Sequence, residues 1–110
     1  MSNLFQNTIE QLEKVFRIKK FDEQLILSLR QPNRDIRFSI PVKMDSGDIK
    51  IFDGYRVEYN NILGPYKGGI RFHENTDIDE IKALALLMTL KCSLAGLPMG
   101  GGKGGVTVNP

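Results

Sequence analysis

The most constraining feature of this chain is a run of glycines close to its C-terminal end. Nine of its 11 glycines lie after residue 63, and five of these surround Lys103 between residues 100 and 105. Because glycine has no Cβ atom, such a segment either turns sharply or lets another part of the molecule approach its backbone closely. The first 60 residues have the pattern of a scaffold. We therefore expect the functional residues to lie in the second part of the chain.

Size and composition limit the classes of protein to which the chain can belong. With 110 residues, 41% of them hydrophobic, it is expected to form one compact domain with a core. The net charge is +2 and the charges are spread evenly, which argues against a basic face that binds nucleic acid. Cys92 and His73 are the only cysteine and histidine, so we expect no intrachain disulfide and no metal site.

Patterns that would direct the chain to a membrane or out of the cell are also missing. No uncharged apolar run approaches the roughly 18 residues that a membrane-spanning helix needs. The first residues have neither the basic nor the apolar region of a secretory signal. We therefore expect a cytoplasmic protein without a membrane partner.

The first third of the chain has helical periodicity. Apolar side chains recur at helical spacing over residues 3–17, which predicts an amphipathic helix. Asp22 has the chemistry of an N-cap for a second, shorter helix, which Pro32 should end. We expect residues 1–34 to be an N-terminal helical segment and residues 35–110 an α/β domain.

From Ile36 the period changes to two, which is typical of strands. A half-buried strand is expected through Met44, with Pro41 indicating either an edge position or a bulge. A hairpin turn at residues 45–48 should lead into a second strand over 49–59, bulged at residues 53–54. A third short strand is expected over residues 69–72.

A mostly buried helix is expected from Asp77, paired with Glu80 in a capping-box pattern, to about Ala95. Residues 106–108 have the composition of the start of another strand, and a strand that opens there would be cut short at Pro110. The predicted fold class is therefore α/β, a mixed β-sheet flanked by helices, incomplete at its C-terminus.

The glycine run does not fit the known phosphate loops. A Walker loop would need glycine in place of Leu97 and a hydroxyl in place of Gly104. The glycines at positions 100, 102 and 105 match G-x-G-x-x-G, but that motif binds dinucleotides only between a strand and the start of a helix. Here a helix precedes the motif and strand-forming residues follow it. We therefore expect no cofactor-binding residues in this chain.

Three lysines remain as candidates for chemistry. Lys103 lies among glycines, and a lysine with little water around it is suited to acid–base or electrostatic catalysis. The alternative is a flexible surface loop with a solvated lysine. Lys91 lies near the end of an apolar helix, and its alternative is a side chain that snorkels to water. Lys67 lies beside glycines, and its alternative is an ordinary lysine in a turn. Together the three cations could converge on a small dianion.

Three separated motifs carry a family resemblance. They are GPYKGGIRFH at residues 64–73, MTLK at residues 88–91 and LPMGGGKGGV at residues 97–106. In this order they resemble the glutamate dehydrogenases of the Glu/Leu/Phe/Val dehydrogenase family. The segments SIPV at 39–42 and GYRV at 54–57, followed by Asn60, are also similar to the N-terminal substrate-binding and oligomerisation domain of that family. The resemblance covers about residues 35–110.

The resemblance implies a role for each matching residue. Lys67 corresponds to the lysine that holds the side-chain carboxylate of the substrate, Lys91 to the one that holds the α-carboxylate, and Lys103 to the catalytic lysine. Met88 and Gly68 correspond to further substrate-binding positions. Leucine and phenylalanine dehydrogenases typically lack a lysine at the position of Lys67, so its presence favours glutamate. One departure is Leu90, where the family often has tryptophan.

The function that the resemblance implies is NAD- or NADP-dependent oxidative deamination of L-glutamate to 2-oxoglutarate and ammonia. It also implies a homo-oligomer, typically a hexamer, and residues 36–44 could pair with a neighbouring subunit. In this family the catalytic aspartate and the nucleotide-binding domain lie further along, so we expect a truncated N-terminal part that is inactive by itself. The alternatives are an inactive module that binds a dicarboxylate or a partner subunit, and a leucine- or phenylalanine-type dehydrogenase.

Overall fold

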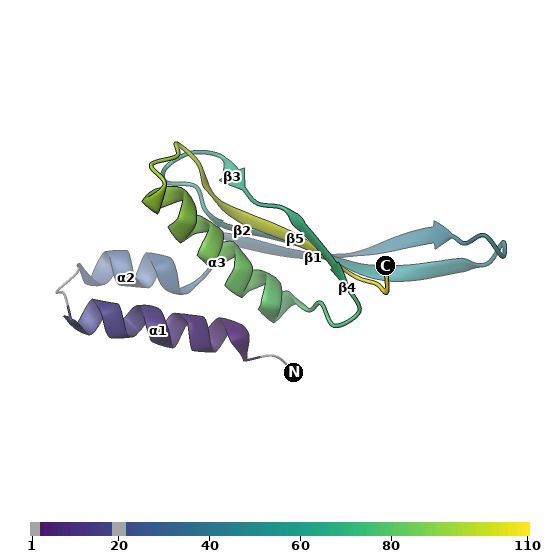
Figure 1. Ribbon diagram of the computed structural model, residues 1–110, viewed down its shortest axis with the longest axis horizontal. Helices are drawn as coiled ribbons and strands as arrows, with labels where there is room; N and C mark the ends of the chain where they lie inside the picture. Colours follow the sequence, from purple (N-terminus) through teal and green to yellow (C-terminus); the bar gives the residue numbers. More distant parts are fainter. Residues whose placement is uncertain (1–2, 19–21) are drawn as a thin grey trace.

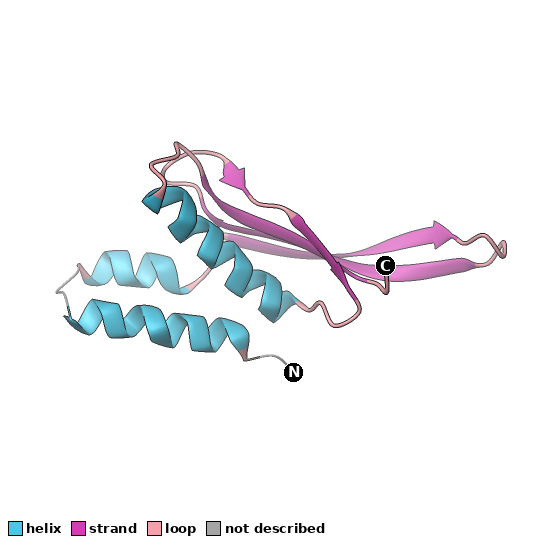
Figure 2. Cartoon of the chain, viewed as in Figure 1, coloured by secondary structure: helices cyan, strands magenta, loops and turns pink. Residues whose placement is uncertain are grey.

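The computed structural model describes residues 3–18 and 22–110, which form a sheet layer and a helix layer (Figure 1). The five-stranded sheet has the order β1-β2-β5-β3, and β4 also pairs with β5. The helices of the described residues lie on one face of this sheet (Figure 2). The pairs β1–β2 and β2–β5 are antiparallel, whereas β3 and β4 run parallel to β5. The predicted class, a mixed sheet with helices, is confirmed.

The two N-terminal helices begin and end close to the predicted positions. Helix α1 spans Leu4–Ile18 and helix α2 spans Glu23–Arg30. Asp22 is the N-cap of α2, and its Oδ1 accepts a hydrogen bond of 2.8 Å from the Gln24 amide. An ion pair of 3.1 Å between Arg30 and Glu13 joins the two helices.

Strands β1 (Arg34–Lys43) and β2 (Ile49–Asn60) form a long hairpin whose tip extends beyond the rest of the molecule (Figure 1). The predicted turn is confirmed, with Gly47 at a φ of 92°. The predicted bulge at residues 53–54 is wrong, because the pairing is continuous there and shifts instead between Glu58 and Asn60. Gly54 instead leaves room for the Phe38 side chain of β1, because a Cβ atom on Gly54 would lie 2.5 Å from that ring.

Strand β1 is an edge strand, paired only with β2 among the described residues, as Pro41 indicated. The apolar side chains of β1 are more exposed than predicted for a half-buried strand, because the helices cover the opposite face of the sheet. This uncovered face, which we call the open face, has a hollow of about 470 Å³. Its lining includes Phe38, Ile40, Arg56, Ile70 and Phe72.

The glycine run is a strand, not a loop. Strand β5 spans Gly100–Thr107 and lies between β2 on one side and both β3 and β4 on the other. The alternative of a flexible loop around Lys103 is therefore wrong. The prediction that a strand begins at residue 106 is also wrong, because the strand begins at Gly100. Strand β3 (Tyr66–Lys67) was not predicted, whereas β4 (Ile70–His73) corresponds to the expected third strand.

Glycine in β5 allows close packing by helix α3 (Ile78–Leu94). A Cβ atom on Gly101 would lie 2.1 Å from the Thr89 hydroxyl oxygen, and one on Gly105 would lie 2.6 Å from Ile81. Side chains at these two positions would therefore lift the helix off the sheet. Asp77 caps α3 as predicted, and Gly96 follows its end with a φ of 70°.

The core lies between the sheet and the helices. The buried cluster contains Ile9 of α1, three residues of β2 and three of α3, and Phe5, Leu12, Ile78, Leu84 and Leu90 pack around it. The three β2 residues, Tyr55, Val57 and Tyr59, alternate along the strand and therefore share its helix-facing side. Helix α1 thus contributes to the same core as the sheet.

Candidate functional site

Lys103 lies in the middle of β5, on the side of the sheet that carries α3. Gly101 and Gly105, two residues away in either direction, face Thr89 and Ile81 of that helix, and alternate residues of a strand share a face. Lys103 is half-buried. Its Nζ atom lies 3.6 Å from the position that a Cβ atom on Gly69 would occupy. The side chain therefore extends from the central strand to the break between β3 and β4.

Lys67 lies on β3 and pairs in register with Gly101. Paired residues of neighbouring strands point to the same face, so Lys67 also belongs to the α3 side of the sheet. It is exposed. Its neighbour Gly68 packs against the backbone of β5, where a Cβ atom on Gly68 would lie 1.5 Å from the Gly102 carbonyl oxygen. The close approach expected of a glycine is present here, between two segments of the protein itself.

Lys91 and Met88 lie near the C-terminal end of α3. Met88 is half-buried and Lys91 is exposed, close to the end of the helix. Thr89, between them, is the residue whose backbone lies against Gly101. The C-terminal part of α3 is therefore held directly over the position in β5 with which Lys67 is paired.

Gly101 is thus the point at which the structure brings the three predicted segments together. It pairs with Lys67, lies two residues before Lys103, and contacts the helix two residues before Lys91. Within residues 3–18 and 22–110, none of the three lysines makes an ion pair or a side-chain hydrogen bond. By contrast, Lys82, which lies on α3 like Lys91, forms an ion pair of 3.6 Å with Asp35. Lys67 and Lys103 therefore share the α3 side of the sheet, and Lys91 lies on the helix that packs against that side.

Sequence reasoning missed a polar cluster that adjoins β3. Asn33, just before β1, donates hydrogen bonds from Nδ2 to the Tyr66 hydroxyl at 2.9 Å and to Asn61 Oδ1 at 3.2 Å. These residues lie about 30 positions apart in the sequence. No local pattern connects them, and only the pairing of the strands could have identified the cluster.

The G-x-G-x-x-G match does not lie in the context that binds a dinucleotide. The glycines at positions 100, 102 and 105 lie inside a strand that follows a helix. A pyrophosphate site instead needs the N-terminus of a helix directly after such glycines. The predicted context, in which a helix precedes these glycines, is confirmed.

Residues 3–18 and 22–110 contain neither a cluster of metal-ligating side chains nor a membrane-spanning helix. No three side chains among their His, Cys, Asp and Glu residues gather closely enough to hold a metal ion. None of their helices combines the length and the apolar character that crossing a membrane requires.

The profile of one family matches most of the chain. It is described as "Glu/Leu/Phe/Val dehydrogenase, dimerisation domain" and matches residues 32–110.

Two curated relatives show the similarity in sequence. The NAD-specific glutamate dehydrogenase of Clostridioides difficile is 58% identical over 82 residues, which is 74% of this chain and 20% of that protein. The NADP-specific glutamate dehydrogenase of a Synechocystis strain is 45% identical over 108 residues, which is 98% of this chain and 25% of that protein. The chain thus spans about a fifth to a quarter of the length of these relatives.

Solved structures show the same similarity in three dimensions. The crystal structure of glutamate dehydrogenase from Peptoniphilus asaccharolyticus superposes with a TM-score of 0.94 at 44% identity, covering 99% of this chain and 28% of that one. The hetero-hexameric glutamate dehydrogenase from Thermus thermophilus, in a Leu-bound form, superposes with a TM-score of 0.93 at 36% identity, over 98% of this chain and 26% of that one.

Proposed function

The chain belongs to the Glu/Leu/Phe/Val dehydrogenase family, and on this basis we propose that it provides the substrate-binding part of a glutamate dehydrogenase. The observation that supports this proposal is the meeting of β3, α3 and β5 at Gly101, because each of these three elements carries one of the lysines Lys67, Lys91 and Lys103. Glutamate carries two carboxylates, and each can form a charge-assisted hydrogen bond with an ammonium group.

We assign the three lysines separate tasks. Lys67 binds the side-chain carboxylate and Lys91 the α-carboxylate, and Met88 and Gly68 border the same site. Two fixed carboxylates leave Cα in one orientation, which lowers the entropic cost of reaction. Lys103 lies on the most rigidly held element of the three, because β5 is bonded on both edges. It is therefore the lysine to which we assign the chemistry.

The proposed reaction converts L-glutamate, NAD⁺ or NADP⁺ and water into 2-oxoglutarate, ammonium, the reduced nucleotide and a proton. Glutamate loses one amine proton to solvent and a hydride from Cα to NAD⁺ or NADP⁺, which leaves an iminium group, and water must then add to that carbon. In the proposed step Lys103 Nζ accepts a proton from this water, and the resulting ammonium group stabilises the negative charge that develops on oxygen. Release of ammonia then gives the keto acid.

The nicotinamide nucleotide supplies the oxidising power in the relatives named above. Since the glycines at positions 100, 102 and 105 lie inside a strand and not before a helix, we propose that nucleotide binding depends on regions of those relatives that this chain does not span. Residues 1–110 alone should accordingly form no NADH or NADPH from glutamate.

We also propose a division of labour along the chain and an assembly. Residues 1–34 are a helical lead, and residues 35–110 are the substrate-binding and dimerisation domain, in line with the family match over 32–110. The complete protein is proposed to form a cytoplasmic homo-oligomer, with a hexamer favoured by the hexameric neighbour. The edge strand β1 and the apolar open face are the surfaces available for this contact.

The substrate assignment is tested in a chimera in which residues 1–110 replace the matching segment of the Peptoniphilus asaccharolyticus enzyme. In this chimera, Lys67→Leu should lower kcat/KM for glutamate about 10- to 150-fold, the range for loss of a charge-assisted hydrogen bond. The preference for glutamate over norleucine should narrow by the same factor. Steady-state kinetics with both amino acids measure this.

Lys14→Leu is the control, since it removes an exposed lysine from α1, outside both the proposed site and the proposed assembly surfaces, and should change neither value. The proposal fails if glutamate preference survives Lys67→Leu. It also fails if the chimera assembles to the mass of its parent and unfolds cooperatively, yet does not oxidise glutamate.

A further inference from the structure

Strand β3 has little means of its own to orient Lys67. It contains two residues, and two glycines, Gly68 and Gly69, follow it directly. Backbone hydrogen bonds attach this region to β5, from the Gly100 amide to the Pro65 carbonyl at 2.9 Å and from the Gly104 amide to the Gly69 carbonyl at 2.9 Å. They fix where the segment lies, but the glycines leave its rotation about the strand axis weakly restrained.

The residue that restrains this rotation is Tyr66, the neighbour of Lys67. Its Cβ atom lies 3.2 Å from the position of a Cβ atom on Gly102, so Tyr66 lies on the open face of the sheet. Lys67, next in the strand, points to the opposite, α3 side. A side chain held on one face therefore holds its neighbour on the other.

Tyr66 is held at its far end by Asn33. The Asn33 side-chain amide donates to the Tyr66 hydroxyl at 2.9 Å, and the Asn33 backbone amide donates to the Tyr59 carbonyl of β2 at 2.9 Å. Asn33 is thus anchored at the start of β1, two strands away from β5. Because Gly100 and Gly102 have no side chains, the surface between Asn33 and Tyr66 is free for the phenol ring.

We propose that Asn33 and Tyr66 are positioning residues that hold Lys67 on the α3 side of the sheet, ready for the side-chain carboxylate of the substrate. The inference rests on the proposed role of Lys67. It extends that role by naming the residues that determine how strongly the site distinguishes an acidic from an apolar side chain.

The test uses Asn33→Ala, Tyr66→Phe and the double variant in the chimera described above. Each single variant should raise KM for glutamate about 2- to 10-fold with little change in kcat. KM for norvaline, which lacks the side-chain carboxylate, should stay unchanged. The double variant should be no worse than the worse single one, because both remove the same hydrogen bond. Asn7→Ala, which removes an amide side chain from the surface of α1, is the matched control.

A second comparison separates positioning from a general structural effect. In a Lys67→Leu background, Asn33→Ala should leave KM for glutamate where Lys67→Leu alone put it. The inference is overturned if KM rises equally for glutamate and norvaline, if the two single effects add, or if the effect of Asn33→Ala persists without Lys67. If Lys67→Leu itself changes nothing, the proposed function fails. If only Asn33→Ala and Tyr66→Phe change nothing, the inference alone fails.

Discussion

At the scale of single residues, adjacent glycines of this protein have different steric surroundings. A Cβ atom on Gly68 would lie 1.5 Å from the Gly102 carbonyl oxygen, which no side chain movement can relieve. A Cβ atom on Gly69 would lie 3.6 Å from the Lys103 ammonium nitrogen, an ordinary contact with the end of a flexible side chain. The two positions therefore form a matched pair for substitution.

We expect Gly68→Ala to lower the free energy of unfolding by roughly 3 kcal/mol or more, because β3 must separate from β5. Gly69→Ala should stay within about 1 kcal/mol of the parent. Urea unfolding of the 110-residue chain, followed by circular dichroism, measures both. Equal effects of the two substitutions would contradict the close backbone contact between Gly68 and Gly102.

The role assigned to Lys103 makes a prediction about rate. In the chimera, Lys103→Ala should lower kcat about 10²- to 10⁴-fold, the usual effect of losing a positioned acid–base group. KM for glutamate should change much less, since Lys67 and Lys91 still bind the carboxylates. Lys103→Arg should also be slow, because arginine keeps the charge but does not give up its proton. A Lys103→Ala variant that keeps kcat and loses affinity would identify Lys103 as a carboxylate ligand instead.

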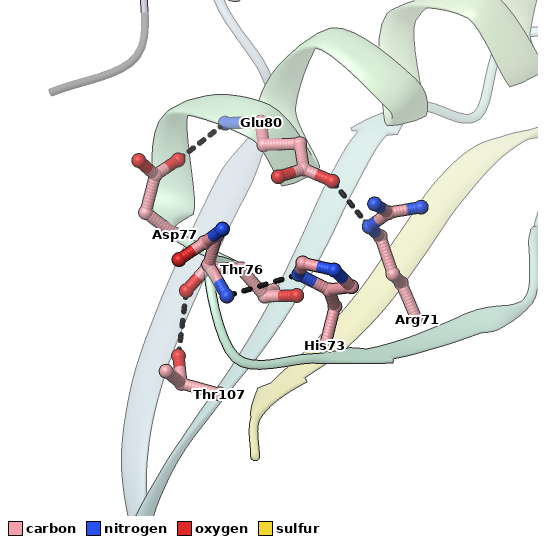
Figure 3. A network of polar contacts seen from close by, with 7 residues as sticks. Arg71, His73, Thr76, Asp77, Glu80 and Thr107 are labelled. Carbon is pink, nitrogen blue, oxygen red and sulfur yellow. Dashed lines mark hydrogen bonds and ion pairs between the residues drawn. The ribbon is translucent and has the colours of Figure 1, made fainter. Parts of the chain in front are cut away.

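At the scale of elements, the start of α3 shows how the helix is tied to the sheet edge (Figure 3). Asp77 Oδ1 accepts a hydrogen bond of 2.8 Å from the Glu80 amide, as the capping pattern predicts. The Glu80 carboxylate does not complete a capping box, because it forms an ion pair with Arg71 of β4 instead. The Thr107 hydroxyl of β5 donates to the Thr76 carbonyl at 2.6 Å. Both parallel strand ends are therefore linked to the beginning of α3.

Asp77→Ala should lower the free energy of unfolding by about 0.5–2 kcal/mol, as loss of an N-cap does. Asp22→Ala removes the same kind of cap from α2, which buries none of its residues. It should reduce helical signal but have less effect on global unfolding, since α2 can open locally before the core does. Thermal unfolding of both variants provides the comparison. An equal loss of stability would show that α2 unfolds together with the core.

Elements were predictable wherever their own periodicity determined them. Local patterns predict the helices α1, α2 and α3, the β1–β2 turn and the Asp77 cap, and all of these are confirmed. Strand β5 was not predictable, because Gly100–Thr107 has no alternation and poor strand propensity. Close packing by Thr89 and Ile81, a tertiary contact, makes glycine the residue that fits there. The family motifs likewise singled out the three lysines as candidates but gave no sign of the hydrogen bond between Asn33 and Tyr66, because only the fold brings these two residues together.

At the scale of the whole molecule, one buried tyrosine connects the sheet to both N-terminal helices. The Tyr59 side chain of β2 is completely buried in the core. Its hydroxyl donates to the Leu29 carbonyl in the last turn of α2. Its ring lies edge-on to Phe5 of α1, with 6.2 Å between the ring centroids. Ionisation of this phenol would place a charge in the core and break its bond to α2.

Burial raises the pKa of the Tyr59 phenol above its ordinary value of about 10. Since the folded state holds this proton more tightly than the unfolded state, the group contributes its full stability below about pH 10. That contribution falls as the pH rises further, by up to about 1.4 kcal/mol per pH unit.

Below pH 9 Tyr59→Phe should lower the free energy of unfolding by about 1–3 kcal/mol, because the Leu29 carbonyl loses its partner. From about pH 10.5 to 12 the variant should lose stability less steeply than the parent, so the two curves converge. Urea unfolding of the chain across this range measures the slopes. Phe5→Leu is the control: it removes the ring contact without an ionisable group and should shift the curve while keeping its slope. Parallel curves for Tyr59→Phe and the parent would show that another group causes the alkaline loss.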